Sequence, residues 1–487
     1  MLTQILLVPV FLAHWSVEEY GCWLIVQTII GVSSMLSASH QNFIGFEFLK
    51  VGDKNPERMR LLFYSALPFA ILIAILEFVA IAALIYFGVI RTTLDPEGNL
   101  NSALLEQAFW ALILYSISWL VSSSIGGLAG RAVAPYGYFP RMTWWGTILA
   151  IVQALISGLA VALGANLLQT VICIVVAGFV VNIPIHLDMW GMFRRHHLYP
   201  VRPDWGLGQK NVVRSLAIAL GAVLDISRQQ GVRIFLGALI GVTPMTAFST
   251  MRTMSNLSLQ GIGTITNPVM PEIMRFLREK DVERTNATVG FVWFLAVIVL
   301  SPVLIAFQWL MPLIFHAWTR GKIEFNPVLF GLFSVTLLIF SIARPPMAVL
   351  QGNNLLRVQL YMSIGVSAVA VGGIFLFTGR FGVVGAAACL LVAELIGTII
   401  AVWFAWKWLD KSGIGFPWRL FRVSVLSIAV AAATIAAMSW LPRRTTLAII
   451  GAAMVINLLI GIAFVRRLPP LAVAKVRGLF KSRRSAS

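Results

Sequence analysis

Long apolar stretches recur along this chain of 487 residues, and they constrain its fold more than any other feature. A helix needs about 20 apolar residues to cross a bilayer, whose interior offers no water to open backbone groups. A window of about that length gives about fourteen candidate spans. They are 1–14, 20–40, 61–90, 104–128, 143–163, 168–190, 211–227, 233–265, 287–312, 328–350, 359–378, 382–404, 423–441 and 446–464. The sequence therefore predicts an all-α polytopic membrane protein.

The composition excludes a soluble protein, because 11% of the residues are charged and a soluble surface needs about 25%. The net charge of +18 lies mainly in short links between apolar stretches, so we expect no nucleic-acid partner. Cys22, Cys173 and Cys389 lie inside apolar stretches without CxxC spacing. We therefore expect neither a disulfide framework nor a metal site.

The spacing of polar links predicts two six-helix lobes and two additional C-terminal helices. The longest link contains Pro200 and Pro203 and resembles a hinge between the lobes. The expected segments are an N-lobe at 1–193, a cytoplasmic linker at 194–210, a C-lobe at 211–404, a cytoplasmic loop at 405–422, the last two spans at 423–465 and a basic tail at 466–487.

Lys and Arg concentrate in alternate links, which places both termini in the cytoplasm under the positive-inside rule. Several Trp residues, Trp144 and Trp145 among them, fall near predicted span ends, where an amphipathic ring prefers the interface. The first span is short, and we expect the true start to lie upstream of Met1.

A weak internal repeat supports two lobes. Residues 46–60 and 271–286 each follow a span with a Glu at its end, Glu47 and Glu272, and then a mixture of charges ending in Glu-Arg. Six spans separate them, which predicts a parallel repeat around a central site. The alternative is two ordinary basic loops after helices.

Motifs for enzyme chemistry are absent from the sequence. It contains no GxxxxGK[ST] phosphate loop, no HExxH and no GxSxG. The links on the predicted outer side are too short for a catalytic domain. We therefore expect no enzyme and no cofactor.

Charged residues inside spans mark candidate sites, because a charge at mid-membrane costs about 2.5–3.5 kcal/mol on insertion scales. Arg252 lies in a helix whose polar residues Thr246, Ser249, Thr253 and Asn256 share one face. This pattern predicts the wall of a water-filled cavity, with Arg252 and Asn256 as substrate-binding residues. The alternative is that Arg252 pairs with a buried carboxylate.

Two more arginines complete the substrate-binding candidates. Arg344 precedes Pro345 and Pro346, which we expect to break or kink the helix and open a site; the alternative is that Arg344 extends to the cytoplasmic surface. Arg233 lies in the eighth span. A cationic set of this kind suits an anionic substrate such as a pyrophosphate.

Four further residues are candidates for ion coupling or gating. Glu77 and Glu394 are single carboxylates within spans, which also serve as interhelical hydrogen-bonding groups. Asp225 and Arg228 stand three residues apart, so they either pair on one helix face or form a gate.

Three stretches together carry a family resemblance. They are VPVFLAHWSVEEYGCWLIVQTI at 8–29, FLGALIGVTPMTAFSTMRTMSNL at 235–257 and PVMPEIMRF at 268–276. In this order they resemble the Wzx-type polysaccharide (O-antigen) flippases of the MOP exporter superfamily, which also contains MurJ-type and MATE-type transporters. The short first span departs from the family pattern.

The resemblance implies a two-lobed transporter of a bacterial inner membrane, working by alternating access. Its expected substrate is an undecaprenyl-pyrophosphate-linked oligosaccharide, moved to the periplasmic leaflet for lipopolysaccharide or other surface polysaccharide synthesis. Expected partners are this lipid-linked oligosaccharide, membrane lipids, and polysaccharide polymerase and chain-length machinery. Two alternatives stay open, a MATE-like cation or drug antiporter using Glu77 and a membrane-embedded polymerase or ligase.

Overall fold

The fold is all-helical in the part of the chain that is described, with no strand there. The computed structural model describes residues 2–52, 55–96, 98, 100–226, 231–266, 269, 273, 276–277, 280–353, 355–441 and 443–470. The prediction of an all-α polytopic membrane protein is confirmed. The chain forms two compact units, Met1–Thr246 and Ala247–Ser487, and the division lies within helix α12 (Val242–Thr266).

Helices lie over all of the predicted spans. Among the described residues, nine helical segments are long and apolar enough to cross a membrane, or up to ten when the bent pair α2 and α3 counts as one. One of these, Arg357–Lys411, covers two predicted spans. The first, seventh and eighth spans are shorter or more polar, which explains the difference from the predicted number.

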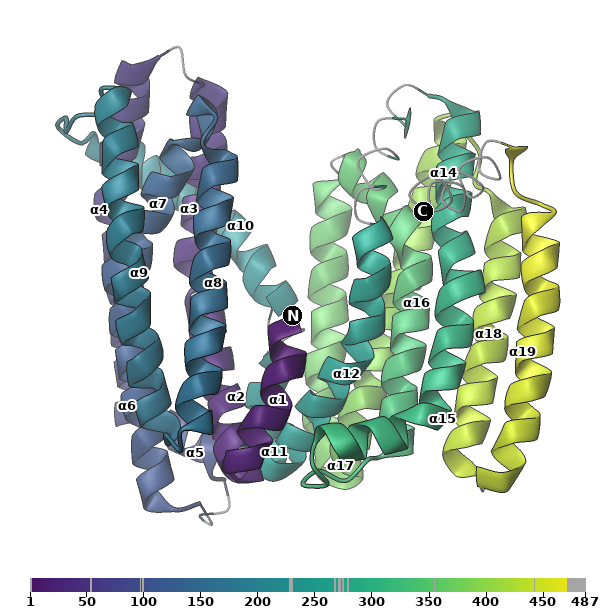
Figure 1. Ribbon diagram of the computed structural model, residues 1–487. Helices are drawn as coiled ribbons and strands as arrows, with labels where there is room; N and C mark the ends of the chain where they lie inside the picture. Colours follow the sequence, from purple (N-terminus) through teal and green to yellow (C-terminus); the bar gives the residue numbers. More distant parts are fainter. Residues whose placement is uncertain are drawn as a thin grey trace, which may run out of the picture. The chain divides into compact units, whose positions relative to one another are not determined.

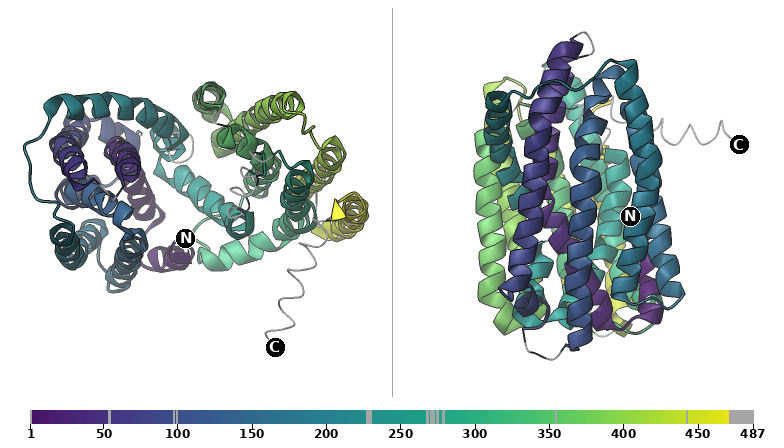
Figure 2. Two further views of the ribbon diagram at one scale, coloured as in Figure 1. Left: turned by 90° about the horizontal axis from the view of Figure 1, so that it is seen from above. Right: turned by 90° about the vertical axis from the view of Figure 1, so that its left-hand side faces the viewer.

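The first unit is a bundle whose long helices lie side by side (Figure 1). Figure 2 shows most of them end on. Its elements are α1 (Leu2–His14), α2 (Val17–Ser33), α3 (Met35–Val51), α4 (Pro56–Tyr86), α5 (Val89–Leu94), α6 (Ser102–Ser118), the π-helix η1 (Trp119–Ser123), α7 (Ser124–Ala132), the 3-10 turn η2 (Ala134–Tyr136), α8 (Phe139–Ala162), α9 (Leu167–Arg195), α10 (Trp205–Ile226) and α11 (Val232–Ile240).

Local sequence explains where several of these helices begin. Ser16 and Glu19 form a capping box at the start of α2, and Asn166 and Gln169 form another at the start of α9. Between α2 and α3 the chain bends by 40° at Ser34. This bend starts a new helix, and a helix start leaves backbone N–H groups without intrahelical acceptors.

The link between α9 and α10 is attached to the first unit. The Tyr64 hydroxyl donates to the Leu198 carbonyl over 3.2 Å, and the Asp204 amide donates to the Ser65 hydroxyl over 2.8 Å. Helix α10, which the sequence assigned to the second lobe, packs against α3 and α4. The predicted lobe boundaries remain predictions.

The second unit packs around a core formed by α14, α16, α17 and α18. Beyond the rest of α12, its elements are α14 (Val282–Leu295), the π-helix η4 (Ala296–Leu300), α15 (Ser301–Trp318), α16 (Pro327–Gly352), α17 (Leu356–Lys411), α18 (Trp418–Trp440) and α19 (Arg443–Val465). Trp293 is fully buried within this core.

Helix α17 folds back on itself at Gly382. This residue has φ +57° and ψ −146°, a conformation that is essentially restricted to glycine. Across the turn, a Cβ on Gly373 would lie 2.8 Å from Cys389 Sγ, and one on Gly397 would lie 3.1 Å from Val366. The two arms therefore pack as an antiparallel hairpin, which gives the predicted eleventh and twelfth spans.

Helix α16 is continuous through Pro345 and Pro346, so these prolines do not break it, and the predicted kink stays a prediction. Proline lacks an N–H, and Pro346 therefore leaves the carbonyl of Ile342 without its helical donor. The Trp293 indole Nε1–H donates to that carbonyl over 3.2 Å. A buried side chain from α14 thus replaces the missing donor, and α16 continues as a helix.

Candidate functional site

A cavity of about 800 Å³, open to the surface, is lined by residues of α3, η1, α7, η2, α8 and α9 in the first unit. We call it the first-unit cavity. Its polar lining residues are Gln41, Asn42, Ser122, Arg131, Thr143, Asn182 and His186. Of the described residues that line it, none is acidic.

Arg131 supplies the positive charge of this cavity, and neutral groups hold its guanidinium. Its Nε and Nη2 donate to Asn42 Oδ1 over 3.1 and 2.7 Å. Its Nη1 donates to Gln41 Oε1 over 3.1 Å and to the Gly127 carbonyl over 2.7 Å. Because both amide oxygens face the guanidinium, the Asn42 and Gln41 amide N–H groups turn away from it.

Glycines make room for this arrangement. A Cβ on Gly127 would overlap the side-chain oxygen of Gln41, and one on Gly45 would lie 3.0 Å from Arg131 Cδ. A Cβ on Gly126 would lie 3.0 Å from His186 Nε2. These small residues therefore admit polar side chains from neighbouring helices.

His186 presents an acceptor to the cavity. Its Nδ1 lies 2.7 Å from the Asn182 backbone carbonyl, which only accepts, so Nδ1 carries the proton. In the neutral ring Nε2 is then an acceptor. The lining thus contains donors at Asn42 and Arg131 and an acceptor at His186.

A second polar group surrounds Asp188 on α9. Arg141 donates to both of its carboxylate oxygens, Nε to Oδ2 over 2.8 Å and Nη2 to Oδ1 over 2.7 Å. The Trp145 indole Nε1–H also donates to Asp188 Oδ2, over 2.8 Å. Trp145 lines the first-unit cavity, so this ion pair orients a ring in the cavity wall.

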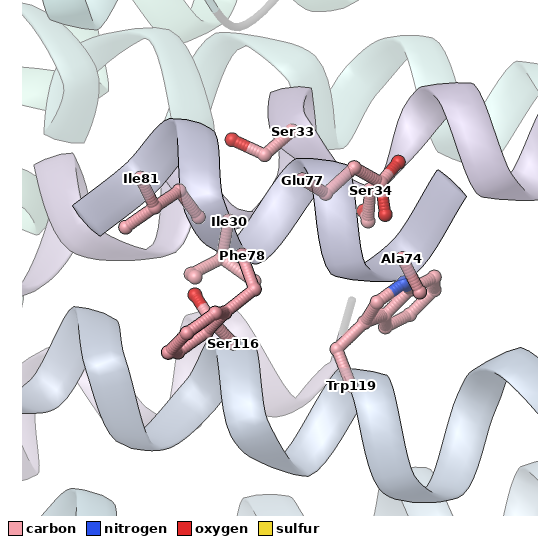
Figure 3. Close-up of a pocket in the computed structure, with 9 residues that line it drawn as sticks. All are labelled: Ile30, Ser33, Ser34, Ala74, Glu77, Phe78, Ile81, Ser116 and Trp119. Atoms are coloured by element: carbon pink, nitrogen blue, oxygen red, sulfur yellow. The ribbon is translucent and has the colours of Figure 1, made fainter. Parts of the chain in front are cut away.

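Glu77 lies beside a smaller cavity of about 10 Å³, on the order of one water. Figure 3 shows its carboxylate near Ser34, with Trp119 on the neighbouring helix. The backbone N–H of Ser37 donates to Glu77 Oε1 over 2.8 Å, and the Ser37 hydroxyl donates to Oε2 over 2.6 Å. The bend at Ser34 frees this N–H, and Glu77 therefore caps the start of α3.

Trp119 connects the two cavities, because it lines both of them. Its indole Nε1–H donates to the Ser37 hydroxyl over 3.0 Å, and Ser37 in turn bonds Glu77. A change at Glu77 therefore reaches a ring in the wall of the first-unit cavity through one intervening side chain.

The predicted substrate-binding residues lie on other elements. Arg252 and Asn256 are half-buried on α12, and Arg233 is half-buried on α11. Arg344 is half-buried on α16, with its guanidinium 5.6 Å from the Phe340 ring centroid. None of the four is among the described residues that line the first-unit cavity.

Two of the polar side chains on α12 form hydrogen bonds within their own helix. The Thr246 hydroxyl donates to the Val242 carbonyl and the Thr253 hydroxyl to the Ser249 carbonyl, over 2.7 and 2.9 Å. Thr246 and Ser249 are buried, and Thr253 and Asn256 are half-buried. The predicted wall of a cavity at this stripe stays a prediction.

The remaining coupling and gating candidates lie apart from Glu77 in the sequence. Glu394 is half-buried on the second arm of α17. Asp225 lies near the end of α10, where its side chain is not described, and Arg228 lies outside the described residues. Glu272 and most of the stretch 268–276 also lie outside them.

Arg131 was not among the residues predicted from the sequence, and Trp145 was predicted only as a residue of the membrane interface. A signal was present in the polar run SHQN at 39–42 inside an apolar stretch, and in the run SSSIGGLAGR at 122–131. Both runs line or border the first-unit cavity.

No protein-family model matches the chain, and no curated protein matches it by sequence. Solved structures do match. An inward-facing multidrug resistance MATE family transporter of the MOP superfamily has a TM-score of 0.65 at 11% identity, covering 85% of this chain and 95% of that one. The lipid II flippase MurJ in an inward closed conformation has a TM-score of 0.61 at 11% identity, covering 96% and 97%.

A third match is a MOP superfamily transporter from Pyrococcus furiosus with a binding pocket of reversed polarity. Its TM-score is 0.54 at 13% identity, covering 82% of this chain and 88% of that one. At these identities the matches establish the fold. The chain therefore has the fold of MOP superfamily transporters.

Proposed function

We propose that the protein flips an undecaprenyl-pyrophosphate-linked oligosaccharide across the bacterial inner membrane by alternating access. The lipid would move from the cytoplasmic to the periplasmic leaflet, for synthesis of a surface polysaccharide such as the O-antigen of lipopolysaccharide. Polysaccharide polymerase and chain-length machinery would act on the product. The observation that carries this proposal is the charge of the first-unit cavity.

That cavity has a cationic side chain, Arg131, and none of its described lining residues is acidic. The nearby carboxylate of Asp188 is neutralised by Arg141. A cationic drug would leave Arg131 facing a like charge, whereas a pyrophosphate or its attached sugars would accept hydrogen bonds from it. A volume of about 800 Å³ also lies within the usual range for ligand sites.

The fold comparison supports a flippase with two additional helices. The match to the lipid II flippase covers 96% of this chain, and the match to the MATE transporter covers 85%. The C-terminal helices α18 and α19 form part of a shared core with α14 and α16. We keep Arg252, Asn256, Arg233 and Arg344 as proposed contacts for the pyrophosphate during transport.

The test is reconstitution into vesicles with a fluorescent lipid-pyrophosphate-linked sugar and a membrane-impermeant quencher. Wild-type protein should make the label in the inner leaflet accessible to the quencher. Arg131→Gln should slow this transfer by about tenfold or more, since hydrogen bonds to charged groups contribute about 1.5–3 kcal/mol. Arg252→Ala should slow it as well.

Arg58→Gln is the matched control, because Arg58 is exposed at the start of α4 in the same unit. It should transfer the lipid at the wild-type rate. Wild-type vesicles that leave the inner-leaflet label protected would contradict the flippase proposal.

A cation antiporter is the second candidate, and Glu77 is the observation that favours it. This carboxylate is 6% exposed and lies beside a cavity that holds about one water, one side chain away from Trp119. In that case vesicles would exchange an organic cation for protons or sodium, and Glu77→Gln would abolish the exchange. If Glu77→Gln still transfers the lipid, the result supports the flippase and not the antiporter.

A further inference from the structure

Trp145 differs from its neighbour Trp144 in the way it is held. The Trp144 side chain is 69% exposed, as expected of a ring at a membrane interface. Trp145 is half-buried, packs against the first unit's hydrophobic cluster and lines the first-unit cavity. One side of the Trp145 ring is therefore supported by protein, and another borders the open space.

The orientation of this ring is fixed from a second helix. Its Nε1–H donates to Asp188 on α9, and the carboxylate of Asp188 is clamped by both donors of Arg141. A Trp at a lipid interface would instead direct its N–H toward headgroups. A ring held in this way loses little conformational entropy when a ligand stacks on it.

The rest of the lining is suited to hydroxyl groups. Asn42 offers its amide N–H groups, Arg131 offers the one N–H that its bonds to Asn42, Gln41 and Gly127 leave, and His186 Nε2 is an acceptor. A sugar hydroxyl both donates and accepts, whereas a phosphate only accepts. A sugar has an apolar face of C–H groups and an edge that carries hydroxyls. The Trp145 ring fits the apolar face, and the neighbouring donors and acceptor fit the hydroxyls.

We propose that the first-unit cavity contains a saccharide subsite in which Trp145 is the stacking platform. Asp188 and Arg141 are positioning residues that hold the ring. The inference rests on the proposed flippase function and specifies which part of the lipid-linked substrate this cavity takes.

The experiment measures binding to purified full-length protein in detergent micelles. The probes are a short-chain polyprenyl pyrophosphate carrying glucose, galactose or N-acetylglucosamine, and the same polyprenyl pyrophosphate without sugar. Wild-type protein should bind at least one sugar-bearing probe about tenfold more tightly than the bare probe, about 1.4 kcal/mol. Trp145→Ala should remove this difference and leave the affinity for the bare probe unchanged.

Three variants serve as controls. Trp145→Phe keeps an aromatic face but loses the N–H that Asp188 holds, so it should retain part of the preference for sugar, whereas Trp145→Ala retains none. Asp188→Asn weakens the clamp from Arg141 and should reduce the preference without abolishing it. Trp144→Ala, which changes the exposed neighbour, should behave as wild type.

The inference and the proposed function fail in different ways. If wild-type protein binds the bare and sugar-bearing probes equally, or if Trp145→Ala weakens both equally, the saccharide subsite is wrong while the flippase proposal stands. If wild-type protein binds none of the probes, both proposals are wrong.

Discussion

The contact between Trp293 and the proline pair of α16 gives a prediction that is independent of function. Trp293 donates to the Ile342 carbonyl over 3.2 Å, and Pro346 is the reason that this carbonyl is open. Trp293→Phe keeps an aromatic ring in the core but removes the donor. The Ile342 carbonyl is then left unpaired beside a fully buried position.

The magnitude follows from burial and geometry. An unpaired buried polar group costs about 1–3 kcal/mol, and the 3.2 Å distance is longer than the usual one, so we expect the lower end of this range. The smaller phenyl ring adds a packing cost that does not depend on Pro346. Pro346→Ala restores an N–H to the helix and offers the carbonyl a second donor.

A double-mutant cycle isolates the hydrogen bond. The free energy of unfolding is measured in mixed detergent micelles for wild type, Trp293→Phe, Pro346→Ala and the double variant. We expect Trp293→Phe to cost about 1 kcal/mol less in the Pro346→Ala background than in wild type.

Pro345 provides the matched control, because it opens the Ser341 carbonyl, to which Trp293 does not donate. The cycle between Trp293→Phe and Pro345→Ala should be additive within about 0.5 kcal/mol. Equal costs of Trp293→Phe in the wild-type and Pro346→Ala backgrounds would refute the reasoning.

Three further predictions concern Glu77, Gly382 and Gly127. Glu77→Ala leaves the buried Ser37 N–H without an acceptor and should lower the free energy of unfolding by about 1–3 kcal/mol, with Glu77→Gln losing less; equal losses would contradict the capping role. Gly382→Ala should cost about 1–3 kcal/mol in the same assay because of its positive φ, and an unchanged stability would show that the turn tolerates a side chain. Gly127→Ala should displace Gln41 and slow lipid transfer in vesicles, with no further loss when Gln41→Ala is added; additive losses would show that the two residues act separately.

The sequence predicted the helices well because each span depends on a local quantity. Apolar length alone is enough to demand a helix where backbone groups meet lipid. Gly382 illustrates how far this goes, since two adjacent apolar stretches were separated correctly and the glycine at their junction makes the turn. Proline was a less reliable signal, because Pro345 and Pro346 predicted a break or a kink in α16. The helix has no break, and the indole N–H of Trp293 replaces the donor that Pro346 lacks.

The candidate site was predicted only in part. Glu77 was identified because a carboxylate in an apolar stretch is conspicuous, but its partner Ser37 lies 40 residues away. Arg131 was not among the candidates, although the polar run 122–131 that ends at it was a signal. Its acceptors, Gln41 and Asn42, come from another helix.

The sequence by itself determined that the chain is helical, apolar and multi-pass, because those properties follow from composition and from periods of a few residues. Only the tertiary structure decided which polar groups meet. The bend at Ser34, the small residues near Gly127 and the clamp on Trp145 bring together side chains from α3, α4, α7, α8 and α9. These contacts between side chains depend on how the helices pack in three dimensions, and the pattern of residues along the chain does not show that packing.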